Sequence, residues 1–411
     1  MLLRIAPSKL KGKITVQPSK SDSHRKLICA AFANGVSTVD NVSLSEDINA
    51  TLRCVSAAGA SYDISDSVVY PGRKLIGIKG TAGTCLEIRT ADCGESGSTL
   101  RFMSMIFSAA GGQTELTGHG RLPFRPLNGA MSLFERNNIA YTYPGEGCFL
   151  PLTIDGELYS GKHEVDSSVT SQYLSGLLMG LPAFSKHGLI KATGKFESRG
   201  YVDVTIEAVR QFGIRIKGNN PYIVPENNGL TAIDTSVEGD WSNASYFLVM
   251  QALGSDLEIT GLNPASLQPD AVILKNIQLV RDSESPVIDV SECPDIMPSL
   301  AVLGAAMDKT LKITGGRRLR AKESDRIKSV AAGLAGLGIK YKEVDDGIEI
   351  YGNGKVPGGE INAFNDHRIA MAFASLCVVS KRDIVINGAD SVSKSYPLFY
   401  EDLRKLGGII I

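Results

Sequence analysis

The sequence predicts a mixed α/β fold arranged in two lobes. Three observations support this class: a short β-rich segment recurs along the chain, amphipathic helices ending in glycine follow it, and the 43 glycines are spread out rather than clustered. The recurring segment occupies residues 37–41, 114–118, 189–194, 257–261, 311–315 and 384–388. Three copies precede a boundary near residues 234–239 and three follow it, so we expect three units in each lobe.

The helices expected between these strands are short and amphipathic. The clearest ones end on glycine and span residues 52–59, 208–213, 334–338 and 402–407. The β-rich segments recur at an irregular spacing of roughly 55 to 75 residues, which is unlike a solenoid of short repeats. Strand and helix alternation alone would also suit a doubly wound sheet, so the two-lobe interpretation depends on the motifs described below.

Composition excludes several classes of protein. A formal net charge of -1 argues against a general nucleic-acid coat, and no apolar run is long enough to cross a membrane. The amino-terminal residues lack the apolar core of a secretory signal. Seven cysteines without a CxxC pair predict neither a disulfide framework nor a zinc site. We therefore expect a reduced, soluble protein of the cytoplasm.

Two segments of the first lobe combine small polar residues with cations at the start of an apolar helix. Residues 18–25 include Lys20 and Arg25, and residues 94–101 include two glycines and two serines before Arg101. Each could be a phosphate or carboxylate site at a helix amino terminus, or an ordinary cap that satisfies free amides. The loop 120–126 adds Arg121 and Arg125, which could equally be surface arginines.

Further polar clusters occur before other helices. Residues 167–173 carry more hydroxyl and amide groups than a cap requires, which suits a polyhydroxylated ligand. Residues 317–326 place the carboxylate Glu323 among many cations, as in a proton-transfer site or in a solvated helix face. A P-loop-like run at 156–163 ends in His163 where Mg²⁺ binding needs Ser or Thr, so we interpret it as a surface turn.

The polar clusters occupy equivalent positions, because each lies in a loop after a predicted strand or at the start of a predicted helix. Both halves contribute Lys and Arg although the chain as a whole is nearly neutral. This pattern predicts small, multiply anionic substrates bound between two lobes.

Five ordered motifs resemble the 5-enolpyruvylshikimate-3-phosphate synthase family, which has 3-phosphoshikimate 1-carboxyvinyltransferase activity. They are Lys20-Ser21-x-Ser23-x-Arg25, Thr170-Ser171-Gln172, Lys322-Glu323-Ser324-Asp325-Arg326, Asn365-Asp366-His367-Arg368 and Ser393-Lys394-Ser395. The resemblance implies a two-lobed inside-out α/β barrel of six βαβαββ repeats, three per lobe. It also implies one lobe of residues 1–18 with 238–411, another of residues 19–237, and an active site in the cleft between them.

The resemblance further implies a transferase of the shikimate pathway, in the biosynthesis of chorismate and aromatic amino acids. Its substrates would be phosphoenolpyruvate and shikimate 3-phosphate, and the enolpyruvyl group would move to the 5-hydroxyl through a tetrahedral intermediate with release of phosphate. Acid–base groups and cations suffice for this chemistry, so no metal or other cofactor is expected. A monomer without nucleic-acid or membrane partners is expected.

The resemblance assigns residues by position. Shikimate 3-phosphate would contact Lys20, Ser21, Arg25, Thr170, Ser171, Gln172, Ser198, Tyr201, Asp295 and Lys322. Phosphoenolpyruvate would contact Lys20, Gly97, Arg121, Gln172, Arg326, Arg368 and Lys394. Asp295 would act as base on the 5-hydroxyl and Glu323 would exchange a proton with the methylene carbon. How Asp295, Glu323 and Lys20 share the individual steps is left open.

The sequence departs from the family pattern at Arg318, where relatives often carry an asparagine, and at Glu95 and Phe102 beside the Gly97 loop. In those relatives the asparagine contacts the shikimate phosphate, so the resemblance does not carry that contact over to Arg318. Two alternatives remain. One is the related UDP-N-acetylglucosamine enolpyruvyl transferase, whose closing motifs differ, and the other is a catalytically silent anion-binding protein. The presence of two carboxylates in a cationic region argues against silent binding.

Overall fold

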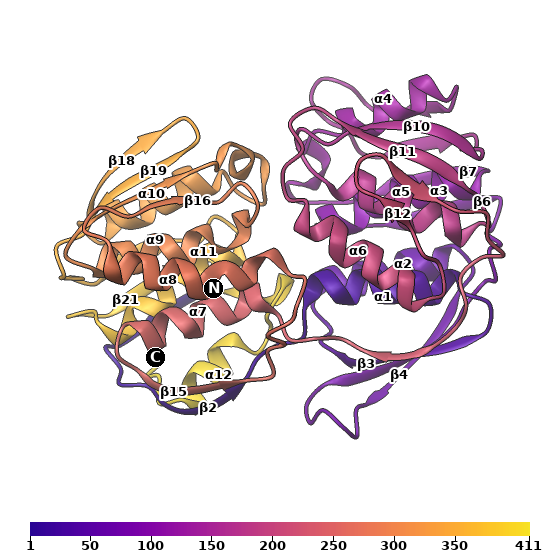
Figure 1. Cartoon of the computed structure of the whole chain (residues 1–411). Helices are drawn as coiled ribbons and strands as arrows, with labels where there is room; N and C mark the ends of the chain where they lie inside the picture. The colour runs from indigo at the N-terminus through magenta and orange to yellow at the C-terminus, as the bar shows by residue number, and fades with distance from the viewer. The chain divides into compact units, whose positions relative to one another are not determined.

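The computed structural model describes residues 1–411, which divide into two compact units. The contiguous unit is Lys20–Glu238, and the discontinuous unit joins Met1–Ser19 to Gly239–Ile411. Each unit has its own hydrophobic core, and no buried core residue belongs to both. The chain passes between the units after Ser19 and again after Glu238 (Figure 1).

The contiguous unit contains three four-stranded sheets with one pattern of pairing. In spatial order they are β14 (Asp234–Ser236), β3 (Val36–Val42), β5 (Lys74–Lys79) and β4 (Ser61–Asp66); β6 (Ile88–Asp92), β7 (Gln113–Thr117), β9 (Leu152–Asp155) and β8 (Ala140–Thr142); and β10 (Gly161–Asp166), β11 (Gly188–Thr193), β13 (Tyr222–Val224) and β12 (Lys217–Gly218). In each sheet the first two strands are parallel and the others antiparallel. The sheets are therefore three copies of one architecture.

Six helices accompany these sheets. They are α1 (Lys20–Phe32), α2 (Glu46–Ala57), α3 (Gly97–Ala110), α4 (Asn128–Arg136), α5 (Gln172–Ala183) and α6 (Gly200–Gln211), with a short 3₁₀ turn η1 (Leu122–Phe124). Helices α1, α3 and α5 are buried over nearly their whole length, whereas α2, α4 and α6 keep an exposed face. A helix that is buried on all sides lies in the interior of its unit, which places these three at the centre.

The discontinuous unit repeats the pattern with strands from both ends of the chain. Its sheets are β16 (Val287–Asp289), β17 (Thr310–Thr314), β19 (Gly347–Tyr351) and β18 (Lys340–Val344); β1 (Leu2–Ile5), β21 (Ile384–Asn387) and β20 (Gly359–Asn362); and β15 (Asp256–Thr260) with β2 (Lys11–Thr15). Its helices are α7 (Trp241–Ala252), α8 (Ile273–Asp282), α9 (Met297–Ala306), α10 (Arg326–Gly336), α11 (His367–Ala374) and α12 (Phe399–Lys405). Short 3₁₀ turns are η2 (Pro269–Val272), η3 (Pro294–Ile296), η4 (Arg317–Ala321), η5 (Ser375–Val378) and η6 (Ala389–Lys394).

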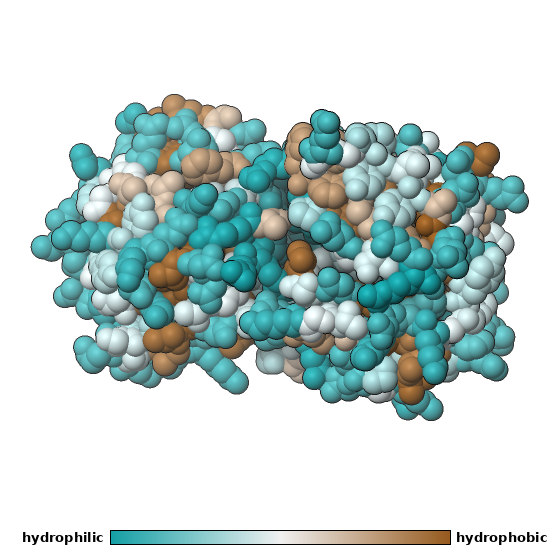
Figure 2. Space-filling view, turned by 90° about the horizontal axis from the view of Figure 1, so that it is seen from above, coloured by the Kyte–Doolittle hydropathy of each residue, from teal (hydrophilic) through white to brown (hydrophobic).

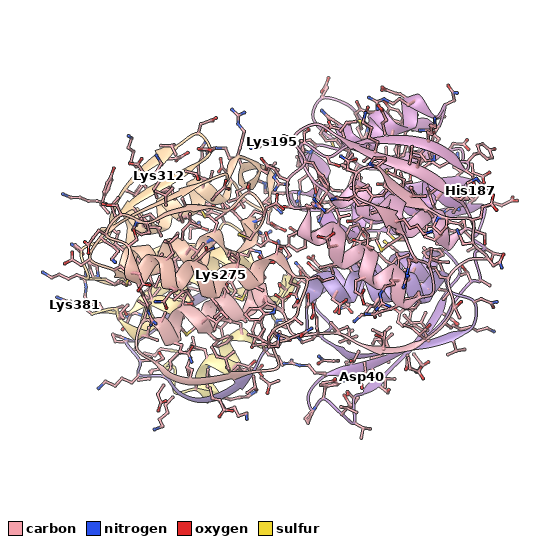
Figure 3. All side chains as sticks on the ribbon, in the orientation of Figure 1. Asp40, His187, Lys195, Lys275, Lys312 and Lys381 are labelled. Atoms are coloured by element: carbon pink, nitrogen blue, oxygen red, sulfur yellow. The ribbon has the colours of Figure 1, made fainter.

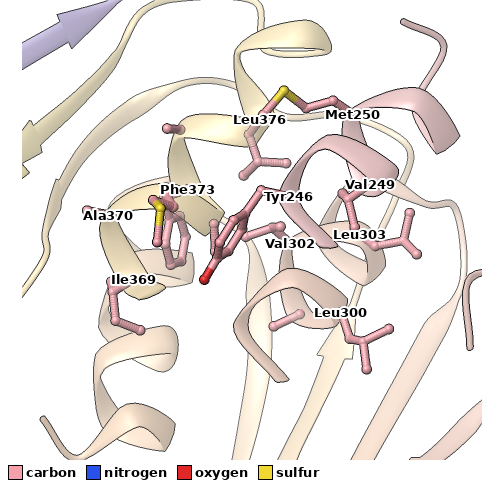
Figure 4. Close-up of a cluster of buried hydrophobic side chains, with 14 of the residues drawn as sticks. Tyr246, Val249, Met250, Leu300, Val302, Leu303, Ile369, Ala370, Phe373 and Leu376 are labelled. Carbon is pink, nitrogen blue, oxygen red and sulfur yellow. The ribbon is translucent and has the colours of Figure 1, made fainter. Parts of the chain in front are cut away.

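The core of the discontinuous unit is formed where α7, α9 and α11 meet. Tyr246, Leu300 and Phe373 lie within this cluster, and each is fully buried (Figure 4). Burying a large side chain of this kind contributes roughly 2 kcal/mol. The packing fixes the start of α11, where Arg368 is the second residue.

All six β-rich segments predicted from the sequence are strands, namely β3, β7, β11, β15, β17 and β21. The four predicted helices correspond to α2, α6, α10 and α12. The predicted helix at 52–59 begins six positions earlier than expected, at Glu46, because its polar first turn shows no apolar periodicity. The run 156–163 leads into strand β10 rather than into a helix, so it lacks the strand–loop–helix context of a P-loop. The expected surface turn is wrong in part, because residues 161–163 already belong to β10 and His163 is buried.

The surface is largely polar. In the face seen in Figure 2 hydrophobic residues are scattered among hydrophilic ones, and exposed lysines such as Lys275 and Lys381 extend from the ribbon in Figure 3. No helix combines the length and the apolar character needed to span a lipid bilayer.

Candidate active site

In the contiguous unit the predicted ligand residues gather at the starts of helices. Lys20 is the first residue of α1, Gly97 of α3 and Gln172 of α5, while Tyr201 is the second residue of α6. A helix start presents unpaired backbone N–H groups and the positive end of the helix dipole. Four such starts in one unit suit a ligand with several negative charges.

Arg25 ties the start of α1 to α6. Its guanidinium donates to the carbonyl oxygens of Ser21 at 2.6 Å and Tyr201 at 3.0 Å, and to the Thr205 hydroxyl at 2.7 Å. Burial lowers the pKa of Arg25 to about 10, so it remains a cation at neutral pH. The side chain is therefore a fixed positive charge rather than a mobile surface group.

Gln172 ties the start of α5 to α3. Its side-chain oxygen accepts from Arg101 at 2.9 Å, and its side-chain nitrogen donates to the Ser98 hydroxyl at 2.8 Å. Its backbone N–H donates to the Thr170 hydroxyl at 3.2 Å, and the neighbouring Ser171 is buried. These bonds fix the orientation of the amide group.

Two further residues of the predicted set lie in constrained positions. Lys20 forms an ion pair with Asp47 of α2 at 2.7 Å, and both side chains are nearly nine-tenths buried. Ser198 is buried just before α6 and has a φ of 56°, a conformation rare outside glycine. Both positions are thus set by the surrounding fold.

The Gly97 turn lies against Arg125 rather than Arg121. A Cβ atom added at Gly97 would overlap the Arg125 guanidinium, so the glycine allows that close approach. Arg125 is buried, whereas Arg121 is exposed at the start of η1. The sequence drew attention to both arginines of this loop, but position alone did not single out Arg125 as the one beside the turn.

In the discontinuous unit Arg326 is the centre of a carboxylate cluster. Its guanidinium pairs with Asp295 at 2.8 Å, with Glu323 at 2.5 Å and with Asp366 at 2.8 Å. The Arg326 side chain is 1% exposed. Burial would lower the pKa of Arg326, but the three carboxylates outweigh that effect and raise it. One buried cation therefore sets the mutual positions of the two predicted catalytic carboxylates.

Asp295 lies within ion-pair distance of three cations. Besides Arg326 it pairs with Arg368 at 2.9 Å and lies 3.7 Å from the Lys322 ammonium group. Burial by itself would raise the pKa of Asp295, but Arg368, Lys322 and Arg326 together hold it well below its usual range. Asp295 is therefore ionised throughout the physiological range of pH.

Asp366 organises the start of α11. Its carboxylate accepts from the Arg368 backbone N–H at 3.0 Å as a helix cap, and from the Ser324 hydroxyl at 3.0 Å. Arg368 also donates to the Ser242 hydroxyl, and Lys394 donates to the Asn365 carbonyl at 3.0 Å. Asp366 thus fixes both Arg326 and Arg368, although the sequence assigned it no role.

The structure distributes the predicted residues over both units. The contiguous unit carries Lys20, Ser21, Arg25, Gly97, Arg121, Thr170, Ser171, Gln172, Ser198 and Tyr201. The discontinuous unit carries Asp295, Lys322, Glu323, Arg326, Arg368 and Lys394. Reasoning from sequence did not select Asp47, Arg101, Arg125 or Asp366. Three of these stand inside the quoted motifs or loops, while Asp47 lies at a helix start without such a signal.

Fixed cations around paired carboxylates, on two repetitive α/β units, define a class of enzymes that perform acid–base chemistry on anionic substrates. A family model described as EPSP synthase (3-phosphoshikimate 1-carboxyvinyltransferase) matches residues 5–403. The chain therefore belongs to the EPSP synthase family.

Similar proteins cover the full length of the chain. A 3-phosphoshikimate 1-carboxyvinyltransferase of Clostridium novyi is 39% identical over 427 aligned residues, covering 99% of this chain and 98% of that protein. One of Clostridium kluyveri is 38% identical, covering 99% and 97%. The EPSP synthase structure from Acinetobacter baumannii matches with a TM-score of 0.80 and 26% identity, covering 100% of this chain and 99% of that one.

These similarities confirm the predicted fold class and activity. The six small mixed sheets are consistent with six βαβαββ repeats. The chain has 3-phosphoshikimate 1-carboxyvinyltransferase activity and acts in the shikimate pathway of aromatic amino-acid biosynthesis. Membership of this family implies shikimate 3-phosphate and phosphoenolpyruvate as substrates.

Proposed function

We propose that the two clusters described above together form the catalytic apparatus of this transferase. Shikimate 3-phosphate would be held by Lys20, Ser21, Arg25, Thr170, Ser171, Gln172, Ser198, Tyr201, Asp295 and Lys322. Phosphoenolpyruvate would be held by Lys20, Gly97, Arg121, Gln172, Arg326, Arg368 and Lys394, and we add Arg125 to this set. The observation that carries the proposal is the pairing of Asp295 and Glu323 with one buried arginine, Arg326.

The proposal requires the active site to lie between two lobes, residues 1–18 with 238–411 and residues 19–237. The ligand groups support it because neither unit alone supplies the whole predicted set. The predicted hydroxyl ligands lie on the contiguous unit, and the two predicted catalytic carboxylates lie on the discontinuous unit. We further propose that the protein acts as a monomer in the cytoplasm.

We expect Arg326 and Arg368 to exchange their carboxylate partners for the substrate when it binds. In the structure described here Asp295 and Glu323 share Arg326, and Asp295 also pairs with Arg368. An anionic substrate would draw on the same guanidinium groups and weaken those pairs. Loss of cationic partners raises the pKa of a carboxylate. Each carboxylate would thus become a better base when the substrate is in place.

The proposed chemical steps assign a role to each of these groups. Glu323 in its protonated form would deliver a proton to the methylene carbon of phosphoenolpyruvate, while the 5-hydroxyl oxygen bonds to the adjacent carbon and gives its proton to Asp295. The product of addition is a tetrahedral intermediate that carries a methyl group and phosphate on one carbon. Removal of a methyl proton by a carboxylate or Lys20 would then expel phosphate and restore the double bond. Arg326, Arg368 and Lys322 would stabilise the negative charge along this path.

Phosphate release tests the proposal directly. Phosphoenolpyruvate is supplied alone, with shikimate 3-phosphate, or with UDP-N-acetylglucosamine as the competing acceptor. Release that depends on shikimate 3-phosphate supports the reaction, whereas release only with the nucleotide sugar contradicts it. Binding of both substrates without release would indicate a silent binding protein.

Variants then test the residue roles. Glu323→Gln and Asp295→Asn should lower turnover by about a hundredfold or more, with smaller changes in KM, because they remove proton transfer rather than binding. Unchanged turnover in both variants would contradict the assigned roles while leaving the activity itself intact.

A further inference from the structure

Helix α2 carries none of the predicted ligands, yet it contacts both of the segments that carry Lys20 and Gly97. Asp47 in its first turn pairs with Lys20 at 2.7 Å. One turn further on, the Thr51 hydroxyl lies 2.7 Å from Nδ1 of His24 and 2.8 Å from the Thr99 hydroxyl. A single helix therefore connects the start of α1 to the start of α3.

The connection continues into the turn that precedes Gly97. The Thr99 hydroxyl donates to the Ser96 hydroxyl at 2.8 Å, and the same Ser96 oxygen accepts the Thr99 backbone N–H as the cap of α3. His24, Thr51, Thr99 and Ser96 are each at most 1% exposed. The four side chains form an uninterrupted buried row, which we call the hydroxyl relay.

The single proton on each hydroxyl gives the relay a direction. Thr99 uses its proton toward Ser96, or toward the Asp47 carbonyl at 3.4 Å, so it must accept from Thr51. Thr51 has then used its only proton and must accept from His24. His24 is consequently the donor through Nδ1, and its other ring nitrogen carries the lone pair.

The surroundings of the ring are compatible with this neutral tautomer. Burial, with the charges of Lys20 and Arg25, holds the pKa of His24 well below its usual range. Nε2 is buried without a hydrogen-bond partner, and the ring meets Phe102 edge to face at 6.2 Å. An unpartnered buried N–H is rarer than an under-used acceptor, which again favours the proton on Nδ1.

We propose that His24 and Thr51 are positioning residues that set the distance between the Gly97 turn and the Lys20–Arg25 segment through the hydroxyl relay. The inference rests on the proposed function, in which Gly97 contacts phosphoenolpyruvate. Neither residue touches substrate in this scheme. Their effect on the reaction passes through Ser96, whose hydroxyl caps the helix that begins at Gly97.

The first test measures the tautomer in the intact protein. With ¹⁵N-labelled histidine, the two ring nitrogens of His24 give distinct pyrrole-like and pyridine-like shifts. We expect the pyrrole-like nitrogen to be Nδ1, and we expect Thr51→Val to convert the ring wholly or partly to the Nε2–H form. A wild-type ring with its proton on Nε2 would overturn the relay, whatever the activity of the protein.

The second test measures steady-state kinetics for both substrates. Thr51→Val should raise the KM for phosphoenolpyruvate about three- to tenfold, with kcat and the KM for shikimate 3-phosphate changed by less than about twofold. Thr51→Ser retains the hydroxyl and should restore the parental values. Thr99→Val breaks the relay at the next hydroxyl. If Thr51→Val does not fold, we expect Thr99→Val to show the same rise in the KM for phosphoenolpyruvate.

Thr114→Val is the matched control. Thr114 is a buried threonine of the same unit, in β7, and its hydroxyl has no hydrogen-bond partner. It should therefore leave both KM values unchanged.

Equal effects of Thr51→Val and Thr114→Val, or no rescue by serine, would overturn the positioning role. Failure of the parental protein to release phosphate would instead contradict the proposed function, and the tautomer measurement would still decide on the relay.

Discussion

Asp295 shows how a carboxylate can remain charged in a buried cluster. Its two oxygens are shared by Arg326 and Arg368, with Lys322 further off. Removing one member of such a cluster leaves the other charges without compensation. At the scale of the residue, stability and chemistry therefore depend on the same pairs.

The pH dependence of stability should reveal these pairs. The pKa of Asp295 in the folded protein lies below its value of about 3.9 in the unfolded chain. The stabilisation is therefore fully present above about pH 5 and is lost as the pH falls below about 4. We expect Asp295→Asn to lower the free energy of unfolding by about 2 kcal/mol at pH 7. The difference in the free energy of unfolding between the parental protein and Asp295→Asn should be smaller at pH 3.5. Urea unfolding at several pH values measures this, and a deficit independent of pH would contradict the charge assignment.

The two arginines of the loop after β7 should differ in their effect on phosphoenolpyruvate. Arg125 is buried beside Gly97, whereas Arg121 is exposed and its charge is screened by solvent. Arg125→Ala should raise the KM for phosphoenolpyruvate about tenfold or more, and Arg121→Ala should raise it less. Initial rates over a range of phosphoenolpyruvate concentrations measure both. A larger rise in this KM for Arg121→Ala than for Arg125→Ala would mean that Arg121, and not Arg125, binds phosphoenolpyruvate.

At the scale of the element, strands and helix starts could be predicted because each has a local sequence pattern. The recurring β-rich segments are strands because their β-branched residues alternate with polar ones, and turn residues end them. The polar runs at 18–25, 94–101 and 167–173 do open helices α1, α3 and α5. In α3 the Ser96 hydroxyl caps the free backbone N–H of Thr99. Local patterns of this kind depend only on neighbouring residues.

The partners of those helix starts could not be read from the sequence. Asp47 and Asp366 act on Lys20 and Arg326 across 27 and 40 positions of the chain. Tertiary packing brings such pairs together, and no local period records them. The choice of Arg125 over Arg121 likewise depends on which one faces the Gly97 turn.

Two helix caps allow a matched comparison. Asp325 caps α10 and Asp366 caps α11, and asparagine caps a helix about as well as aspartate. Asp366→Asn should nevertheless lower the free energy of unfolding by about 3 kcal/mol, because Arg326 loses a fully buried carboxylate. Asp325→Asn should lower it by less than about 1 kcal/mol, since its partner Arg320 is partly exposed. Thermal and urea unfolding measure both, and equal losses would mean that capping alone matters.

At the scale of the whole molecule, the two units differ in how the chain builds them. The contiguous unit uses one stretch of sequence and has its own core. The discontinuous unit needs its first 19 residues, because β1 pairs with β21 and β2 pairs with β15.

Fragments should reflect this difference. We expect residues 20–238 alone to give a cooperative unfolding transition, as expected of a domain with a complete core. A chain that lacks residues 1–16 should lose stability in the discontinuous unit, because β15 loses its strand partner and β21 loses one of two. Circular dichroism during urea unfolding measures both. A fragment 20–238 without a cooperative transition would show that the contiguous unit is not independent.

The parallel pairing of β2 with β15 also has a consequence for synthesis in the cell. Thr15 and Thr260 are 245 positions apart, so a ribosome adding about 5 to 20 residues per second makes β15 roughly 10 to 50 s after β2. During that interval the whole contiguous unit emerges and can fold. Strand β2 must meanwhile remain without its partner, which exposes it to chaperones and proteases until β15 has been translated.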